Sequence, residues 1–177
     1  MLIWIDTETT GIGSNGWLLE VGCIITDDQL SEVARLALVV EPDDPVMAYD
    51  YADEFVQNMH TENGLWDAIR NGEGRPKAEV EVRMLNLVLK YSHGESYPMC
   101  GSSIGFDRRW LKQHMPALEA AFHYRNIDVS TVKELHRRFS PHGGEPFEKT
   151  NVHRVLSDLE QSIAELHYYL KEMDWRP

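Results

Sequence analysis

The sequence predicts an α/β protein in which helices pack on a mixed β-sheet. Short apolar runs typical of strands dominate the first quarter of the chain, and helical periodicity alternates with short strands in the rest. The chain has 177 residues, of which 42% are hydrophobic and 10% aromatic. A chain of this size and composition can bury one core, so we expect a single domain over residues 1–177.

The first three predicted strands form an antiparallel meander. The apolar run Leu2–Ile5 is the first strand, and Trp17–Thr26 and Val33–Val40 are the second and third. The turn-forming residues Asp27–Gln29 link the last two strands, and a stretch from Pro42 to Pro45 closes the meander.

Helices and short strands alternate in the remainder. Residues 50–71 have roughly helical spacing that is interrupted at 60–64, and residues 78–92 have the periodicity of an amphipathic helix. Helical spacing continues through Val152–Met173, where we expect one long helix. The remaining predicted elements are strands at 97–101 and 127–129, a helix that starts within 102–111 and is stopped by Pro116, a helix at 130–139, and a Gly-, Pro- and charge-rich loop at 140–151.

Two carboxylates stand at the end of the first predicted strand. Asp6 and Glu8 are two residues apart, so both project from one face of an extended backbone. Their charges repel each other, and an isolated ionised carboxylate is costly to bury. A bound Mg²⁺ or Mn²⁺ would relieve both problems, because these ions prefer oxygen ligands. A polar strand end with two solvated acids is the alternative.

Asp107, His153 and Asp158 are further candidates. Asp107 stands at a helix start, where the helix dipole keeps a carboxylate ionised, although an ordinary first-turn Asp fits the same pattern. Asp158 follows His153 by five residues, which is about 140° of rotation on a regular helix. The two can therefore share a site only if His153 lies in the first turn or on the loop before it. Such a His is a candidate general base, and an ordinary surface His is the alternative.

Composition narrows the class of protein. The formal net charge of −12 argues against a protein that wraps long nucleic acid on a basic surface, but not against a short nucleic acid held by metal ions and a few arginines. Cys23 and Cys100 lie in apolar, strand-like contexts typical of buried thiols in a reducing compartment. The opening apolar run is too short for a membrane span or a signal peptide. We therefore expect a cytoplasmic protein with no membrane association.

The acids and the histidine together resemble the motifs of the DEDD (DnaQ-like) 3′→5′ exonuclease superfamily, in the DEDDh subtype whose last motif is His-x4-Asp. The matches are DTET at 6–9, Asp107 within SIGFDRRWL, and His153 with Asp158. Four further stretches resemble oligoribonucleases in particular, and the likeness covers nearly the whole chain. These stretches are His60–Leu65, Cys100–Leu111, His123–Leu135 and Leu166–Leu170.

The resemblance implies a ribonuclease H-like α/β fold with a mixed five-stranded sheet flanked by helices. It implies a homodimeric, metal-dependent 3′→5′ exoribonuclease that degrades short RNA, down to dinucleotides, to nucleoside 5′-monophosphates. In such an enzyme two divalent ions, Mg or Mn, are held by Asp6, Glu8, Asp107 and Asp158, and His153 is the base. The matched substrate-binding positions are Ile12, Phe55, His60, Ser103, Tyr124, Arg125 and Ser130, with Tyr124 and Arg125 reaching in from a second subunit.

Several positions depart from the family pattern. Thr7 and Thr9 replace bulkier apolar residues, Ser102 stands where Asn is usual, and Phe55 stands where Trp is usual. A proofreading- or trimming-type exonuclease acting on DNA or longer RNA is therefore the alternative, and short DNA is a further candidate substrate. A non-catalytic nucleic-acid-binding relative would be expected to lack at least one of the four acids, and all four are present.

Overall fold

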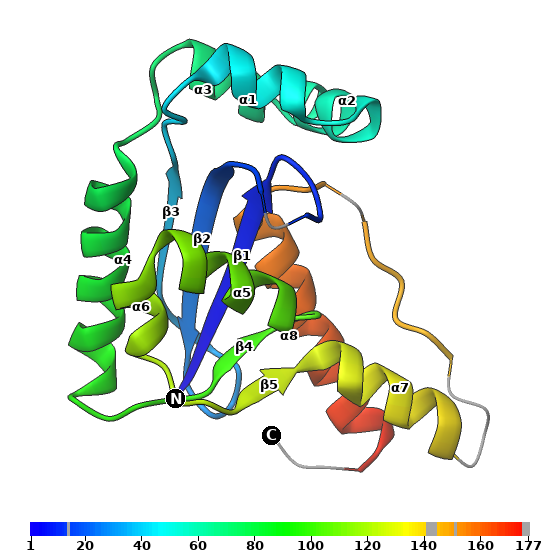
Figure 1. Cartoon of the computed structure of the whole chain (residues 1–177). Helices are drawn as coiled ribbons and strands as arrows, with labels where there is room; N and C mark the ends of the chain where they lie inside the picture. Colours follow the sequence, from blue (N-terminus) through cyan, green and yellow to red (C-terminus); the bar gives the residue numbers. More distant parts are fainter. Residues whose placement is uncertain (14, 141–144, 151, 175–177) are drawn as a thin grey trace.

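A computed structural model describes residues 1–13, 15–140, 145–150 and 152–174. Its centre is a five-stranded mixed sheet of order β3-β2-β1-β4-β5 (Figure 1). The first three strands are antiparallel neighbours, whereas β4 runs parallel to β1, and β5 parallel to β4. The mixed α/β class is thus confirmed. The strands are β1 Leu2–Thr9, β2 Leu18–Thr26, β3 Glu32–Val39, β4 Met99–Gly101 and β5 Asn126–Asp128.

Helices cover both faces of the sheet and one of its ends. Helices α4, α5 and α6 lie over one face, α7 and α8 over the other, and α1–α3 beyond the end where β1 finishes (Figure 1). No helix among the described residues is long and apolar enough to cross a membrane. The bounds are α1 Pro45–Tyr51, α2 Glu54–Glu62, α3 Leu65–Arg70, α4 Lys77–Ser92, α5 Gly105–His114, α6 Pro116–Ala120, α7 Val129–Phe139 and α8 Val155–Glu172.

Strand β1 separates two cores because alternate side chains of a strand point to opposite faces. Ile3 and Ile5 join the cluster that α4, α5 and α6 cover, whereas Trp4 joins the cluster under α8. All three are at most 1% exposed. Asp6 and Glu8 continue the alternation of Trp4, so the sequence directs both carboxylates toward α8.

Two prolines start helices that were not predicted to begin there. Pro45 is the first residue of α1, where the Asp44 side chain accepts hydrogen bonds from the next two backbone N–H groups, those of Val46 and Met47, at 3.1 and 2.9 Å. Pro116 ends the preceding helix as expected but also begins α6. Proline suits a first helical position because that residue's N–H has no partner within the helix.

The last helix is shorter at its start than its periodicity predicts. It begins at Val155 instead of Val152, and Arg154 before it has an extended backbone. Of the predicted loop 140–151, residues 145–150 form no helix or strand, and residues 141–144 and 151 lie outside the described part of the chain.

Gly22 of β2 lets α8 lie close to the sheet beside the end of β1. A Cβ atom at this position would lie 2.6 Å from Val155 Cβ, and Gly22 is the register partner of Asp6. We expect Gly22→Ala to lower the free energy of unfolding by about 1–3 kcal/mol, because overpacking forces the helix away. Urea denaturation measures this change. Gly105→Ala is the control, since a Cβ there meets nothing within 4 Å; equal losses in both variants would contradict the prediction.

Candidate active site

Three carboxylates converge where β1 approaches the start of α8. Oxygen atoms of Asp6, Glu8 and Asp158 all lie within 4.8 Å of one another. The first two come from one face of β1, and Asp158 comes from the first turn of α8. Strand alternation and helix packing together therefore produce a compact acidic cluster.

Asp107 approaches the same strand from the α5 side. Its Oδ1 accepts hydrogen bonds from the Thr7 backbone N–H and the Thr7 hydroxyl at 2.9 and 2.7 Å. The side chain is buried, and among neighbouring charges Asp107 contributes most to the raised pKa of Asp6. Asp107 thus lies next to the cluster but is held by Thr7, whose side chain points to the opposite face of β1 from Asp6 and Glu8.

The carboxyl groups of the cluster have raised pKa values. Burial, followed by the charge of Asp107, raises the pKa of Asp6. Burial, followed by the charge of Asp158, raises the pKa of Glu8 to about 8. These shifts mean that the described side chains do not compensate the negative charge that the site would carry at neutral pH.

The cluster fits a divalent cation. Asp6 Oδ2 is buried and has no hydrogen-bond partner among the described residues. An unpaired buried carboxylate oxygen is costly unless a cation or a proton satisfies it. An all-oxygen set of carboxylates is the donor set that Mg²⁺ and Mn²⁺ prefer.

His153 lies on the segment before α8, which is the placement that the rotation argument requires. Its Nδ1 is 4.0 Å from Asp158 Oδ2. Asp6, His153 and Asp158 line a cleft of about 170 Å³, together with Lys149 and Ser102. The imidazole therefore faces the space into which the acidic cluster opens.

His60 is buried behind the cluster. Its side chain is fully buried, with Nε2 3.3 Å from the Thr9 carbonyl oxygen and 3.7 Å from Glu8 Oε2. Burial lowers the pKa of His60 to about 4, so the ring is neutral at pH 7. The ring supports the end of β1, and its contact with substrate stays a prediction.

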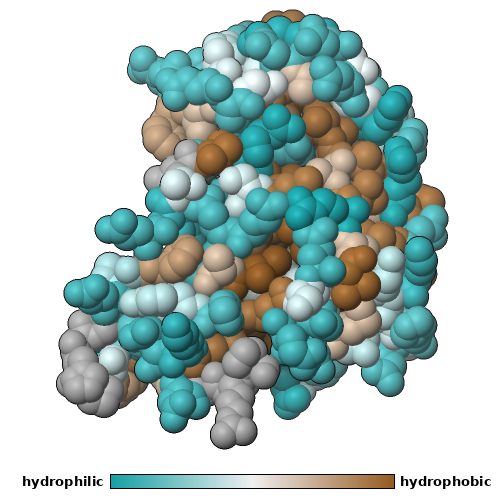
Figure 2. Space-filling model, turned by 180° about the vertical axis from the view of Figure 1, so that it is seen from behind, coloured by the Kyte–Doolittle hydropathy of each residue, from teal (hydrophilic) through white to brown (hydrophobic). Residues whose placement is uncertain are grey.

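Two of the predicted substrate-binding residues, Ile12 and Phe55, are exposed. Ile12 is 87% exposed on the segment after β1, and Phe55 is 70% exposed near the start of α2. Exposed apolar side chains stand among hydrophilic ones on the surface, as the rear view shows for that face (Figure 2). Neither side chain belongs to the packed cores of the described residues, and their contact with substrate stays a prediction.

The remaining predicted substrate-binding residues lie in two groups. The hydroxyls of Ser103 and Ser130 are 3.0 Å apart, and both backbone N–H groups donate to Asp128. Tyr124 and Arg125 are exposed, with the guanidinium 5.2 Å from the Tyr124 ring centre.

Tyr124 and Arg125 do not reach the acidic cluster of their own chain. The following residue, Asn126, pairs with Met99, which pairs with Ile3 near the start of β1. The acids stand at the other end of β1, more than about 10 Å away at about 3.3 Å per strand residue.

A buried ion pair between Glu20 and Arg154, neither of them predicted as a site residue, lies beside the cluster. Glu20 is 3% exposed on β2 and is the register partner of Glu8. Arg154 donates to both of its carboxylate oxygens, at 2.9 and 2.7 Å. A single acid within the apolar run at 17–26 was the signal that could have revealed it.

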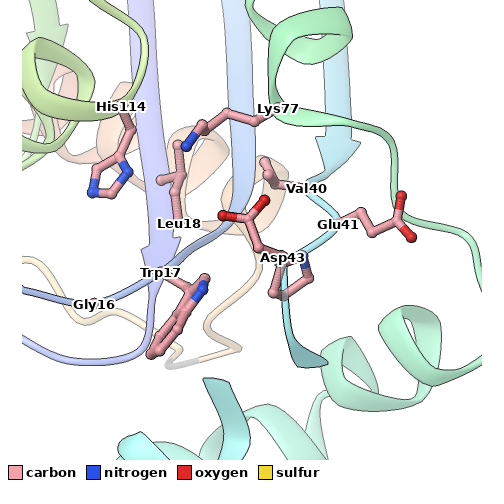
Figure 3. Close-up of a pocket in the computed structure, with 9 residues that line it drawn as sticks. Gly16, Trp17, Leu18, Val40, Glu41, Asp43, Lys77 and His114 are labelled. Atoms are coloured by element: carbon pink, nitrogen blue, oxygen red, sulfur yellow. The ribbon is translucent and has the colours of Figure 1, made fainter. Parts of the chain in front are cut away.

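A second pocket contains none of these residues. It measures about 90 Å³, and Lys77, His114 and Asp43 lie around it (Figure 3). The acidic cleft is therefore the site to which we assign chemistry.

Two solved structures share this fold. Exonuclease X in complex with 5′ overhanging duplex DNA superposes with a TM-score of 0.56 at 18% identity, covering 99% of this chain and 94% of that one. E. coli exonuclease I in complex with a dA16 oligonucleotide gives a TM-score of 0.66 at 14% identity, covering 96% and 40%. The family model described as Exonuclease (RNase_T) matches residues 3–166.

Relatives with similar sequences identify the branch of the exonuclease family. The oligoribonuclease of Nitrosomonas eutropha is 41% identical over 174 residues, covering 97% of this chain and 94% of its own length. That of Azoarcus sp. is 41% identical over 169 residues, covering 95% and 92%. The chain therefore belongs to the exonuclease family and, within it, to the oligoribonucleases.

The raised pKa values predict that the metal-free protein loses stability as pH rises from about 6.5 to about 8.5. In this window the folded state still binds protons that the unfolded acids have released, so stability falls toward the pKa of Glu8, about 8. The lowered pKa of His60 makes stability rise with pH, but only between about 4 and about 6.5, the pKa of an unfolded His. This effect therefore lies below the tested window.

Melting temperatures measured in chelator across this range test the prediction. Glu8→Gln should reduce the slope because it removes the group whose pKa lies near 8, although Asp107, whose pKa burial raises to about 7, still contributes. Added Mg²⁺ or Mn²⁺ should raise the melting temperature most at the alkaline end. A metal-free melting temperature that rises with pH in this window would contradict the assignment.

Proposed function

We propose that this chain is a metal-dependent 3′→5′ exoribonuclease that hydrolyses short RNA, down to dinucleotides, and releases nucleoside 5′-monophosphates. The observation that carries the proposal is the acidic cluster of Asp6, Glu8 and Asp158 beside His153. Membership of the oligoribonuclease family supports the choice of short RNA as substrate. Short DNA is a further candidate substrate.

The four acids divide into two groups around the proposed metal site. Asp6, Glu8 and Asp158 would hold two divalent ions, Mg or Mn, with Asp107 completing the set from the α5 side. When bound, such ions activate the attacking water and stabilise the leaving oxygen of a phosphodiester. Thr7 contributes by fixing the orientation of the Asp107 carboxylate.

His153 acts as the general base in this proposal. Its Nδ1 faces Asp158 Oδ2, which leaves Nε2 as the nitrogen that accepts a proton from the attacking water. The exposure of the ring, 37%, allows the proton to pass on to solvent.

Two features favour short substrates: the negative net charge of the chain and the exposed guanidinium of Arg125. The net charge of −12 makes a long polyanion unfavourable away from the metals. The Arg125 guanidinium can bind a terminal 5′-phosphate with two hydrogen bonds. Since Tyr124 and Arg125 lie at the far end of their own sheet, this closure requires a second copy of the chain, and we propose a homodimer in which each partner supplies the pair.

Turnover of 5′-labelled RNAs of increasing length tests the function. With Mg²⁺ or Mn²⁺ we expect nucleoside 5′-monophosphates as products and the fastest turnover on the shortest RNAs.

Asp6→Asn should abolish turnover without lowering the metal-free melting temperature, because it removes charge from a crowded anionic site. Full activity of Asp6→Asn would exclude the metal assignment, and faster turnover of long strands or DNA would favour the alternative exonuclease class.

Arg125→Ala tests the closure at the 5′ end. Cleavage of a 5′-phosphorylated dinucleotide should fall far more than cleavage of a longer RNA, since only the former depends on the terminal phosphate. Arg138→Ala, an exposed arginine on α7, is the control. Equal losses at every length, with dissociation into monomers by light scattering, would make Tyr124 and Arg125 a purely structural interface pair.

A further inference from the structure

The backbone of His153 is held by a side chain from a distant part of the sequence. Asn63 caps the end of α2, and its Nδ2 donates a hydrogen bond to the His153 carbonyl oxygen. The other end of the same amide is also occupied, because Asn63 Oδ1 accepts from the Leu65 backbone N–H at 3.0 Å. Asn63 therefore bridges the α2–α3 junction and the segment that presents the imidazole.

The residue after His153 is anchored as well. Arg154 is bound at two points by the buried carboxylate of Glu20, and its Nη1 donates to the Asn63 carbonyl oxygen at 3.4 Å. The same Glu20 carboxylate accepts from the Val155 backbone N–H at 3.4 Å. Two-point Arg–carboxylate contacts fix orientation as well as position. The start of α8 is thus tied to β2 on one side and to Asn63 on the other.

His153 needs such support because its backbone is left-handed. Its φ is +53°, a conformation that residues other than Gly adopt at an energetic cost. Such conformations persist only where surrounding contacts hold them. Asn63 supplies the side-chain contact to the His153 backbone carbonyl itself, so its loss would free the segment to relax and turn the imidazole away from Asp158.

We propose that Asn63 is a positioning residue that holds His153 over the acidic cluster, with the Glu20–Arg154 pair as the second support. The inference rests on the proposed role of His153 as the base. A displacement of about 1 Å in a reacting group can cost about 10²-fold in rate. Loss of Asn63 would then lower kcat more than it changes KM, since Asn63 touches none of the four acids; its Nδ2 also lies 3.3 Å from Nδ1 of His60, whose ring is buried behind the cluster.

The test compares Asn63→Asp with the parent chain, each with His153 present and with His153→Ala. The aspartate keeps the oxygen that caps Leu65 but loses the donor to the His153 carbonyl. We expect kcat to fall about 10–10²-fold, as for other residues that orient an active-site ligand, with KM within about two-fold. In the His153→Ala background, itself slowed by about 10²–10⁴-fold, Asn63→Asp should cause no further loss. Asn71→Asp, at the exposed end of α3, is the matched control.

A second readout is independent of turnover. In the metal-free protein labelled with ¹³C,¹⁵N-histidine, the ring signals of His153, assigned by their absence in His153→Ala, should shift in Asn63→Asp and stay unchanged in Asn71→Asp. Asn63→Ser repeats the comparison if the aspartate variant fails to fold, because a serine oxygen can still cap the turn but cannot reach His153.

The outcomes separate the two proposals. An equal loss of kcat in both backgrounds, or unchanged His153 signals, would overturn the positioning role. Full activity of His153→Ala, or no hydrolysis of RNA by the parent chain, would overturn the proposed function, while the NMR comparison would still decide whether Asn63 fixes His153.

Discussion

Repulsion between buried carboxylates is the constraint on which the rest of this structure depends. Asp6 and Glu8 end a strand that is buried on both faces, and Asp158 meets them from α8. Burial raises the pKa of all three groups, and neighbouring acids raise the pKa values of Asp6 and Glu8 further. The metal-free folded chain is therefore destabilised at this cluster when the carboxyl groups ionise. The surrounding elements hold these carboxylates in place despite their repulsion. Such an arrangement is typical of metal-binding sites.

The support comes from separate elements that each restrain one part of the site. Thr7 donates two hydrogen bonds to Asp107, which comes from α5. The buried ring of His60 contacts the end of β1 at the Thr9 carbonyl oxygen and near Glu8. The Glu20–Arg154 pair ties the start of α8 to β2, next to the cluster. Glu20 is the register neighbour of Glu8, so its pairing with Arg154 also keeps a further unneutralised charge out of the site.

Fold class and acidic motif were predictable from the sequence because they rest on local patterns. Apolar runs and period-two alternation identified the strands and directed Asp6 and Glu8 to one face of β1. The rotation between His153 and Asp158 correctly required the histidine to lie at or before the helix start. Helix α6 and the start at Pro45 were missed because proline signals both the end of one helix and the beginning of the next.

The sequence by itself thus determined the mixed α/β class, the face of β1 that carries the acids and the place of His153 ahead of the last helix. Only the tertiary structure decided that Asn63 donates a hydrogen bond to the His153 backbone carbonyl and that Arg154 pairs with Glu20. It also decided that Arg125 lies at the far end of the sheet from the acids of its own chain. The physical reason is range. Periodicity and turn chemistry act between neighbours in the sequence, whereas these contacts join residues 90 and 134 positions apart, or depend on the parallel pairing of β4 with β1 and of β5 with β4, which no short turn connects.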